Sequence, residues 1–546
     1  MKLRELTLGI WLVLAAALPC FAADEWHAVS RQGVVAAGRE TSVEAGMAML
    51  RQGGNAIDAA VATVLVQTVV ESRSVCLGGE VPFLIYDAKR GKVEVLSGMG
   101  AAPQLATAAW FQEHKQGKIP RDDAAGAAVP SLLHVCLTAL DRYGTLRVRD
   151  VTAPLLRSID HDEPRWYADL SRHLRAALEA EQKEADRSAG IRTVIDYFYR
   201  GPAARAIDAW SREQGGLIRY EDLARHETRV EEPISIAYRG YTIYKCGAWT
   251  QGPMLLQTLR LLEHRQVSAM QHNSADYVHV VTEAMKLALA DRDTYYADPK
   301  FVQVPLAELL SDSYTRLRLP LIDDRQASLD LRPGDPRHGR ALLEVAPRDY
   351  RQPDATARDT TTCVTADQWG NVVAATPSGW SGVTAGNSGI VLGSRLISFN
   401  LWAGHPNCIA PGKRPRITLT PTLVCRDGKP VLAISVAGGD LQDQTTLQVL
   451  LNALDFQMDP AQAVTAPRFS TAHHVGSFNQ TSPEPGSLSI YSAVGGDVIG
   501  KLKARGHTVK EVKGPIGHPV LIQLDSSHSE KRVAGDPVAR RHVGAL

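Results

Sequence analysis

The chain has 546 residues, and its 60 lysine and arginine residues nearly balance 59 aspartate and glutamate residues, for a formal net charge of +1. Hydrophobic residues make up 44% of the chain, which is enough for a large core and excludes an intrinsically disordered protein. The balanced charge argues against a nucleic-acid-binding protein. No zinc-type Cys/His spacing, phosphate-binding loop, dinucleotide fingerprint or internal repeat occurs in the sequence, so we predict no cofactor.

An export signal is predicted over residues 1–22. Met1–Arg4 is basic and Leu8–Leu18 is apolar, ahead of a predicted cut after Ala22. The apolar run is too short to cross a bilayer as a helix, and no later run is long enough. We therefore expect a periplasmic or secreted protein without stable membrane insertion.

Six cysteines follow this predicted cut. An even number in an oxidising compartment allows disulfides, whereas a core of this size does not need them. Disulfides and buried thiols are therefore both open for Cys76, Cys136, Cys246, Cys363, Cys408 and Cys425.

Two helices are predicted first along the chain. Ser42 is expected to cap a helix that ends near Leu50. Asn55 is expected to cap the next helix, Ala56–Val70, which is apolar on nearly every face. A helix of that kind belongs inside the molecule.

The middle of the chain reads as a hairpin followed by many helices. Residues 81–86 and 92–96 are expected to pair around a short turn, and residues 130–310 are mostly helical in pattern. Within them, 274–296 is predicted as a long amphipathic helix. Residues 323–359 are rich in Arg, Asp and Pro without periodicity, which is typical of a surface tether.

Strands are predicted to dominate after this tether. A strand over Thr360–Ala366 reaches a turn at Asp367–Gly370 and returns. A later strand, Val431–Val436, runs into Gly438-Gly439 and a helix from about Gln442 to Leu454. Backbone N–H groups at a helix N-terminus stabilise a developing oxyanion, so a strand-initial Thr and this turn together suggest acyl chemistry. Each feature alone also fits an ordinary strand or turn.

Seven further segments are read together because their order and spacing carry more information than any one of them. They are Arg51–Ala62, Tyr199–Pro202, Gly215–Leu217, Tyr238–Tyr241, Pro411–Pro415, Gln448–Asn452 and Ala466–Phe469. With the strand-initial Thr and the Gly-Gly turn, they resemble the gamma-glutamyltranspeptidase family of N-terminal-nucleophile hydrolases, over nearly the whole chain beyond the export signal.

The resemblance implies an α/β fold, an αββα sandwich of two stacked sheets covered by helices. It also implies a precursor that cuts itself just before a Thr, here between Asp359 and Thr360. The helix-rich large subunit, 23–359, and the strand-rich small subunit, 360–546, would then form one core as a heterodimer. The irregular stretch before Thr360 suits a site whose two ends must separate after cutting.

The resemblance also assigns catalytic roles. Thr360 would be the nucleophile, and its freed α-amino group, with a pKa of roughly 7.7–8.0, would be its base. Ser378 stands where members usually have a second Thr whose hydroxyl bonds the nucleophile. Gly438 and Gly439 match the pair whose N–H groups form the oxyanion hole. From the residues alone, an ordinary strand residue is the default interpretation of Thr360, and Ser378 is equally a turn residue.

The substrate contacts of the family correspond here to Met99, Trp380, Arg395, Ser398, Ile417 and Thr418. Met99 stands where members carry an Arg that pairs with the glutamyl α-carboxylate, and Ser398 stands where an Asp holds the α-ammonium. Met offers neither charge nor donor, so the glutamyl clamp is expected to be lost. Arg395 is a possible replacement contact for an anion.

Three functions follow as hypotheses. The first is an exported, self-processing enzyme that cleaves or transfers the acyl group of small amides or peptides, such as the γ-glutamyl compound glutathione. The second is an acylase of the same family that acts on a non-glutamyl amide. The third is a non-catalytic binding protein on this scaffold.

Two clusters in the sequence have a composition that metal sites can also have. Asp160–Glu163 and His473-His474 contain ligand-type side chains but lack a recognised ligand spacing. A solvated acidic loop and ordinary histidines are the expected readings, and no metal is predicted.

Overall fold

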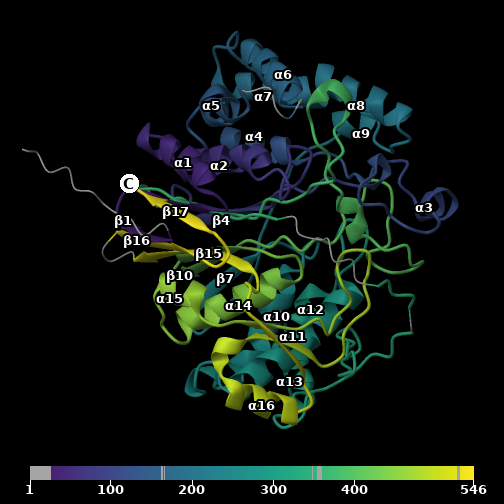
Figure 1. The fold of residues 1–546 in the computed structure, drawn as a ribbon, viewed down its shortest axis with the longest axis vertical. Helices are drawn as coiled ribbons and strands as arrows, with labels where there is room; N and C mark the ends of the chain where they lie inside the picture. Colours follow the sequence, from purple (N-terminus) through teal and green to yellow (C-terminus); the bar gives the residue numbers. More distant parts are fainter. Residues whose placement is uncertain (1–25, 161–163, 165, 347, 353–359, 526–528) are drawn as a thin grey trace, which may run out of the picture.

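The computed structural model describes residues 26–160, 164, 166–346, 348–352, 360–525 and 529–546. The predicted export signal and Asp359 lie outside these residues. Helices cover both outer faces of two stacked sheets, so the chain forms a sandwich of helices, sheet, sheet and helices (Figure 1). The predicted αββα architecture is confirmed.

Both large sheets have seven strands, and their strands pair antiparallel. The first sheet, in spatial order, contains β17 (His542–Ala545), β2 (Val34–Ala37), β8 (Cys363–Ala366), β9 (Val372–Ala375), β3 (Phe83–Asp87), β4 (Lys92–Ser97) and β5 (Arg229–Glu231). The second contains β1 (His27–Ser30), β16 (Glu530–Gly535), β15 (His518–Asp525), β11 (Lys429–Ala437), β10 (Thr422–Arg426), β7 (Tyr241–Lys245) and β6 (Ile234–Tyr238).

The period-two geometry of strands explains why three hydrophobic clusters form. In β2, Val34 and Ala36 face the second sheet, whereas Val35 and Ala37 pack under the first helical layer. The four side chains are fully buried. Central strands are therefore apolar on both faces, as sheets covered on both sides require.

The helices fall into two layers. Above the first sheet lie α1 (Glu40–Arg51), α2 (Ala56–Val70), α4 (Leu132–Tyr143), α5 (Val148–Ile159), α6 (Trp166–Glu181), α7 (Arg187–Tyr199), α8 (Pro202–Glu213) and α9 (Tyr220–Ala224). Against the second sheet lie α10 (Gly252–Glu263), α11 (Ala275–Tyr295), α12 (Leu306–Leu309), α13 (Asp312–Arg318), α14 (Leu441–Leu454) and α15 (Pro460–Thr465). The short helix α3 (Ala108–His114) lies at one side.

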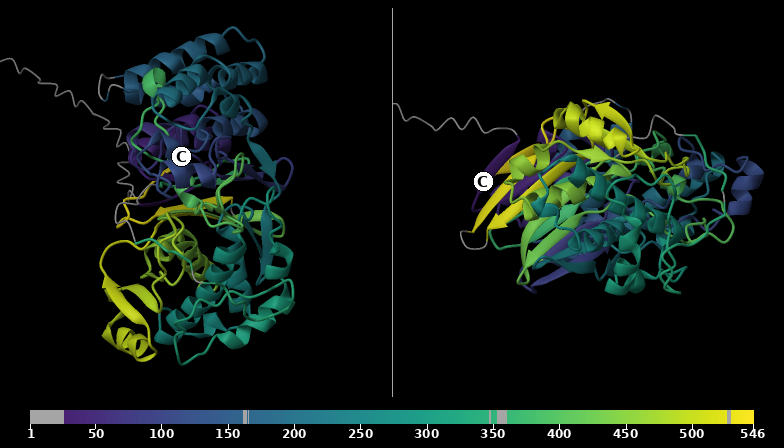
Figure 2. Two further views of the ribbon diagram at one scale, coloured as in Figure 1. Left: turned by 90° about the vertical axis from the view of Figure 1, so that its right-hand side faces the viewer. Right: turned by 90° about the horizontal axis from the view of Figure 1, so that it is seen from below.

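A small third sheet flanks the second helical layer (Figure 2). It contains β12 (Phe469–Ser470), β13 (Ser487–Tyr491) and β14 (Thr508–Val512), with α16 (Gly496–Ala504) between the last two strands. Leu488 and Ile490 of β13 belong to the same buried cluster as α11.

Several predicted elements are confirmed. Asn55 caps α2 by accepting hydrogen bonds from two backbone N–H groups, and α2 is buried on all sides. The hairpins β3–β4 and β8–β9 form as expected. The described part of 323–359 contains no helix or strand.

Two observations concern questions that the sequence leaves open. No helix of the described residues is long and apolar enough to cross a bilayer. The six cysteines are free thiols in the structure.

Two predictions about helices were wrong. Ser42 does not cap α1, which begins at Glu40; the Ser42 hydroxyl lies inside and donates to Glu71 at 3.0 Å. Helix α11 is not amphipathic, because its charged positions are buried as well. Glu283 and Lys286 are both about 2% exposed or less and form an ion pair at 2.6 Å. Paired charges of this kind are indistinguishable from a solvated face in the sequence.

Candidate active site

Thr360 lies at the entry to the first sheet. The predicted strand begins later than expected, at Cys363, because the residues before it bond to the end of α2. The hydroxyl of Thr361 donates to Glu71 at 2.6 Å, and the amide of Gln67 donates to the Thr362 carbonyl at 2.9 Å. These buried bonds fix the backbone on which Thr360 sits.

A hydroxyl and an ion pair stand beside Thr360. Thr360 Oγ1 and Ser378 Oγ are 3.1 Å apart. On its other side, Ser378 Oγ accepts a hydrogen bond of 2.6 Å from the Arg395 guanidinium. Arg395 also donates to Glu80 at 2.5 Å, and both members of this ion pair are 2% exposed. The predicted contact between Thr360 and Ser378 is therefore present, whereas the Arg395–Glu80 pair was not foreseen.

The turn between β11 and α14 has the geometry expected of an oxyanion site. Gly438 and Gly439 have φ values of 139° and 59°, which favour glycine. Their carbonyl groups accept hydrogen bonds from Leu441 and Gln442 at 3.1 and 3.0 Å. Within the described chain, neither glycine N–H donates to a protein acceptor. The N–H groups are thus available at the N-terminus of α14.

Thr360 and the two glycines line one cavity of about 350 Å³. The cavity also exposes groups that sequence reasoning missed: Ser74, Ala437, Leu441, Phe478, Pro515, His518 and Arg541. Arg541 bonds His518 at 2.9 Å and donates to Thr361 at 3.2 Å. Burial lowers the pKa of the Arg541 guanidinium. No spacing in the sequence links these residues to Thr360.

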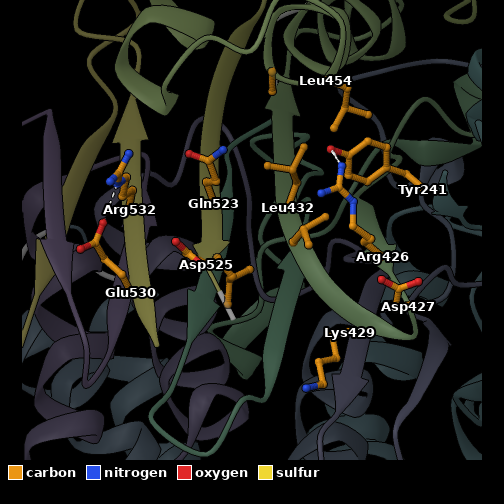
Figure 3. A pocket seen from close by; sticks show the side chains of 13 residues that line it. Tyr241, Arg426, Asp427, Lys429, Leu432, Leu454, Gln523, Asp525, Glu530 and Arg532 are labelled. Atoms are coloured by element: carbon orange, nitrogen blue, oxygen red, sulfur yellow. Dashed lines mark hydrogen bonds and ion pairs between the residues drawn. The ribbon is translucent and has the colours of Figure 1, made fainter. Parts of the chain in front are cut away.

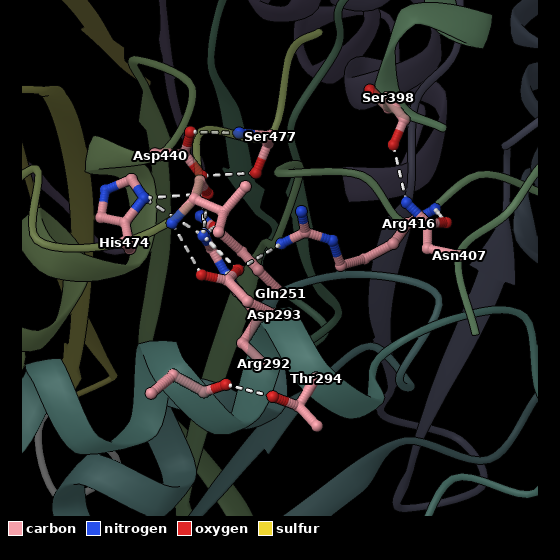
Figure 4. A network of polar contacts seen from close by, with 12 residues as sticks. Gln251, Arg292, Asp293, Thr294, Ser398, Asn407, Arg416, Asp440, His474 and Ser477 are labelled. Atoms are coloured by element: carbon pink, nitrogen blue, oxygen red, sulfur yellow. Dashed lines mark hydrogen bonds and ion pairs between the residues drawn. The ribbon is translucent and has the colours of Figure 1, made fainter. Parts of the chain in front are cut away.

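A buried network holds the end of the glycine turn (Figure 4). Arg292 of α11 donates to Asp440 at 2.6 Å and to Gln251 at 2.7 Å. Asp440 also accepts from the backbone N–H of Ser477 at 2.9 Å. Burial by itself would raise the pKa of the Asp440 carboxyl, but the charge of Arg292 lowers it well below its usual range. Asp440 is therefore ionised and fixed directly after Gly439.

A larger groove adjoins the cavity. It encloses about 840 Å³ and shares Gly438, Gly439, Leu441, Phe478 and Pro515 with the smaller cavity. One wall is the small third sheet, through Ser470, Ser489 and Lys510, which are neighbours across the strands. A substrate held at the glycine turn has room on both sides.

Most of the predicted substrate-contact residues are buried and lie outside the lining of the cavity that contains Thr360. Met99, Ser398, Ile417 and Thr418 are at most 3% exposed, and none lines the cavity that contains Thr360. Met99 borders a different cavity of about 320 Å³. The hydroxyls of Ser398 and Thr418 have no hydrogen-bond partner in the described structure.

Trp380 is only partly buried, two residues beyond Ser378. It lies outside the set of residues that line the cavity of Thr360. A substrate-binding role for Trp380, Arg395 and the four buried residues remains a prediction.

One buried cluster has the composition of a metal site. Ligand atoms of His279, Glu283 and His507 lie within 4.8 Å of one another. However, His279 and His507 bond each other directly at 2.8 Å, and Lys286 and Arg332 already neutralise Glu283. This arrangement disfavours a cation. In the sequence cluster Asp160–Glu163, Asp160 pairs with Arg175, and His161–Glu163 lie outside the described residues. In the cluster His473-His474, His473 contacts the Asp330 carbonyl and His474 contacts Arg292.

A hollow of about 450 Å³ lies on the second sheet (Figure 3). Its charged side chains include Arg426, which contacts Tyr241, and Arg532, which pairs with Glu530 at 2.6 Å. It contains none of the predicted site residues. We therefore place the candidate active site at Thr360.

The chain forms a four-layer sandwich, with Thr360 at the entry to the first sheet and a glycine turn before α14. This arrangement defines an N-terminal-nucleophile hydrolase fold. Residues 42–161 and 187–546 match the family model described as Gamma-glutamyltranspeptidase. The chain belongs to the gamma-glutamyltranspeptidase family.

Relatives with similar sequence identity to this chain carry different names. The chain is 30% identical to the Glutathione hydrolase proenzyme of Escherichia coli (strain K12), over 90% of each chain. It is also 30% identical to the Acylase ACY 1 proenzyme of Pseudomonas sp. (strain SE83), over 90% of this chain and 89% of that one.

Solved structures extend the comparison. LmbA2991HD superposes with a TM-score of 0.86 at 31% identity, over 95% of this chain and 99% of that chain. The cephalosporin acylase from Bacillus halodurans superposes with a TM-score of 0.78 at 25% identity, over 98% and 99% of the two chains.

Proposed function

We propose that this protein is an exported, self-processing threonine hydrolase that cleaves an amide through an acyl-Thr360 intermediate. The observation that carries the proposal is the position of Thr360 Oγ1, 3.1 Å from Ser378 Oγ and in one cavity with Gly438 and Gly439. This arrangement would supply a nucleophile, a supporting hydroxyl and oxyanion donors at one place.

Processing would create the mature nucleophile. Thr360 Oγ attacks the carbonyl of Asp359, the acyl group moves from nitrogen to oxygen, and water hydrolyses the resulting ester. The α-amino group of Thr360 is then free, with a pKa of roughly 7.7–8.0 that suits a general base. Names of relatives that contain "proenzyme" support this step.

The two products, 23–359 and 360–546, are proposed to stay together. In the first sheet, β8 and β9 lie between β2 and β3, so strands from both sides of Thr360 share one ladder. The second sheet likewise places β16, β15, β11 and β10 between β1 and β7. Separating the subunits would therefore break both sheets.

In turnover, the α-amino group accepts the Thr360 hydroxyl proton as Oγ attacks the substrate carbonyl. The N–H groups of Gly438 and Gly439 hold the oxyanion, and the protonated amine then gives its proton to the leaving amine. Water or another amine takes the acyl group from Thr360. The 840 Å³ groove beside the glycine turn has room for the leaving amine.

Two classes of acyl group are candidates for the substrate. A γ-glutamyl substrate such as glutathione is supported by family membership and by relatives named glutathione hydrolase. A non-glutamyl amide is supported by the acylase relatives and by the site itself. Met99 is buried away from Thr360, and Arg395 is bonded to Glu80. We favour the non-glutamyl amide because, among the described residues that line the cavity, Arg541 is accompanied by no Asp or Glu that could hold the α-ammonium of a glutamyl group.

A panel of anilides that differ only in the acyl group tests this choice. Processed wild-type protein is compared with Thr360→Ala on acetyl, glutaryl, phenylacetyl and γ-glutamyl p-nitroanilides. We expect hydrolysis by the wild type alone, with the γ-glutamyl compound a poor substrate. A γ-glutamyl anilide hydrolysed best would reverse the choice of acyl group. A cut protein inactive on every amide, which nevertheless binds them, would favour a binding protein.

A further inference from the structure

The Arg395–Glu80 ion pair contacts the Ser378 hydroxyl but has no place in the proposed reaction so far. Arg395 lies in a 3₁₀ turn, Arg395–Ser398, and Glu80 lies in the loop before β3. The two residues are 315 positions apart in sequence and meet directly behind Ser378. Neither charge reaches solvent, since both side chains are 2% exposed.

The chemistry of a guanidinium fixes the direction of these bonds. An arginine side chain only donates hydrogen bonds, so Ser378 Oγ is the acceptor in its 2.6 Å contact with Arg395. A positive charge at this distance also makes the Ser378 O–H a stronger donor and its oxygen a weaker acceptor. The contact of Ser378 with Thr360, at 3.1 Å, is therefore biased towards donation to Thr360 Oγ1.

We infer that Arg395 and Glu80 are positioning residues that make Ser378 donate its hydroxyl proton to Thr360 Oγ. The inference rests on the proposed function, in which Thr360 Oγ is the nucleophile. Arg395 acts through Ser378 and does not bind the substrate. Glu80 compensates the buried charge of Arg395 and fixes its orientation.

The surrounding backbone holds Glu80 and Ser378 in a fixed relative position. Glu80 and Ser378 exchange backbone hydrogen bonds of 3.0 and 2.9 Å, so the carboxylate and the hydroxyl are held in register. A Cβ atom on Gly79 would lie 2.3 Å from the Ser378 carbonyl oxygen, which shows how closely the two segments pack. Arg395 also stacks over Phe478, at 5.5 Å from the ring centroid, and Phe478 lines the cavity.

The proton balance of the reaction is kept. When Thr360 Oγ attacks, its own proton moves to the α-amino group, while the Ser378 O–H bonds the oxygen on which charge develops. When the acyl-enzyme is hydrolysed, the α-amino group takes a proton from the attacking water. Thr360 Oγ then leaves, again stabilised by that bond, and receives this proton from the α-ammonium group. Ser378 keeps its proton throughout, so it stabilises charge without acting as an acid.

A double-mutant cycle tests the inference. Arg395→Gln, Ser378→Ala and the double variant are compared with the wild type, using the anilide that the wild type hydrolyses best and the rate at which the precursor cuts itself. Arg395→Gln should lower kcat about 10- to 100-fold with KM changed less than about 3-fold, the range expected for losing a charged hydrogen bond. In the Ser378→Ala background the same change should cost less than about 3-fold, since the residue that transmits the effect is absent.

Conservative and control variants separate positioning from general packing. Arg395→Lys keeps a charged donor and should recover at least half of the lost activity on a logarithmic scale. Glu80→Gln combined with Arg395→Gln removes both charges together, so it should fold while keeping the kcat defect. Lys286→Gln breaks another buried ion pair, with Glu283 at 2.6 Å, and should lower stability with kcat unchanged.

Two results would overturn the inference. Effects of Arg395→Gln and Ser378→Ala that multiply would show that Arg395 does not act through Ser378. A change confined to KM, and present only for substrates that carry a carboxylate, would make Arg395 a substrate contact instead. If the wild type neither cuts itself nor hydrolyses any anilide, the proposed function is wrong. If the wild type is active and the kcat losses of Arg395→Gln and Ser378→Ala multiply in the double variant, only the positioning role is wrong.

Discussion

At the scale of single residues, the place of the proposed nucleophile beside the glycine turn was predictable from the sequence, but the ion pairs around it were not. Thr360 and the pair Gly438-Gly439 carry a local pattern, a strand start and a turn before a helix, and the structure places both in one cavity. The Arg395–Glu80 contact spans 315 positions and the Arg292–Asp440 contact spans 148. Such pairs depend on how the layers of the fold stack, and the local hydrophobic periodicity of the sequence contains no information about that.

Thr360 should be indispensable for cutting the chain. Thr360→Ala removes the hydroxyl, so the precursor should remain one polypeptide without amidase activity. Thr360→Ser keeps the hydroxyl and should still cut, with a rate altered by the missing methyl group. Denaturing electrophoresis after timed incubation measures both. Efficient cutting by Thr360→Ala would show that another residue is the nucleophile.

Asp440 should matter for turnover more than for substrate affinity. Asp440→Asn leaves the buried Arg292 with a weaker partner and loosens the turn that presents the glycine N–H groups. Losing one oxyanion donor entirely costs roughly 10²–10³ in kcat, so we expect a loss of about 10-fold with KM nearly constant. Steady-state kinetics measures the change.

The matched control is Asp443→Asn, in the first turn of α14. The Asp443 carboxylate pairs with Lys245 at 2.8 Å and not with the glycine turn. It should affect stability with little change in kcat. Equal kcat losses in the two variants would mean that the helix, and not the turn, is the sensitive element.

At the scale of elements, helices were predicted best where a cap and an apolar face agree. Helix α2 has both, and it forms as expected. Helix α11 shows the limit, because Glu283, Lys286 and Asp291 pair inside the core although their spacing suggests a solvated face. The start of β8 moved to Cys363 because Thr361 bonds Glu71 outside its own strand.

Replacing the cap of α2 should destabilise the whole sandwich. Asn55 accepts from two N–H groups of the first turn and donates to the Tyr143 carbonyl at 2.7 Å. Asn55→Ala should lower the free energy of unfolding by about 1–2 kcal/mol. Urea unfolding gives the value, with the exposed cap Asp459→Ala on α15 as a smaller reference. An unchanged unfolding midpoint would show that the cap contributes nothing.

At the scale of the whole molecule, two sheets interleave the segments before and after Thr360. The sequence indicates one core shared by both parts, but the strand order depends on long-range pairing. β2 next to β8 and β9 next to β3 join segments more than 280 residues apart in the chain, as the hydrogen bond from Ala88 to Asn371 illustrates with a separation of 283. Periodicity predicts strands and not their neighbours.

Buried histidines should make the fold sensitive to acid. Burial lowers the pKa of His473 and that of His134 to about 4, below the ordinary value of 6.5. Between pH 6.5 and 4 the unfolded chain binds protons that the folded chain refuses, so stability is full above 6.5 and is lost as pH falls. Each such histidine contributes roughly 2 kcal/mol of loss by pH 5.

His473→Gln tests this sensitivity, because glutamine can replace the contacts of His473 with the Asp330 carbonyl and the Gly486 N–H. Thermal midpoints of the wild type should fall from pH 7 to pH 5, and those of the variant should fall less. The exposed His338→Gln serves as the control. Parallel curves for the wild type and His473→Gln would contradict the account.

Mass spectrometry of the purified wild-type protein, under native and then denaturing conditions, tests the central claim most directly. We predict one native complex that separates in denaturant into two polypeptides, the smaller beginning at Thr360. The interleaved sheets would keep the cut chain together. A single uncut polypeptide after long incubation, or a small fragment that begins at another residue, would contradict the assignment of Thr360 as the self-generated nucleophile.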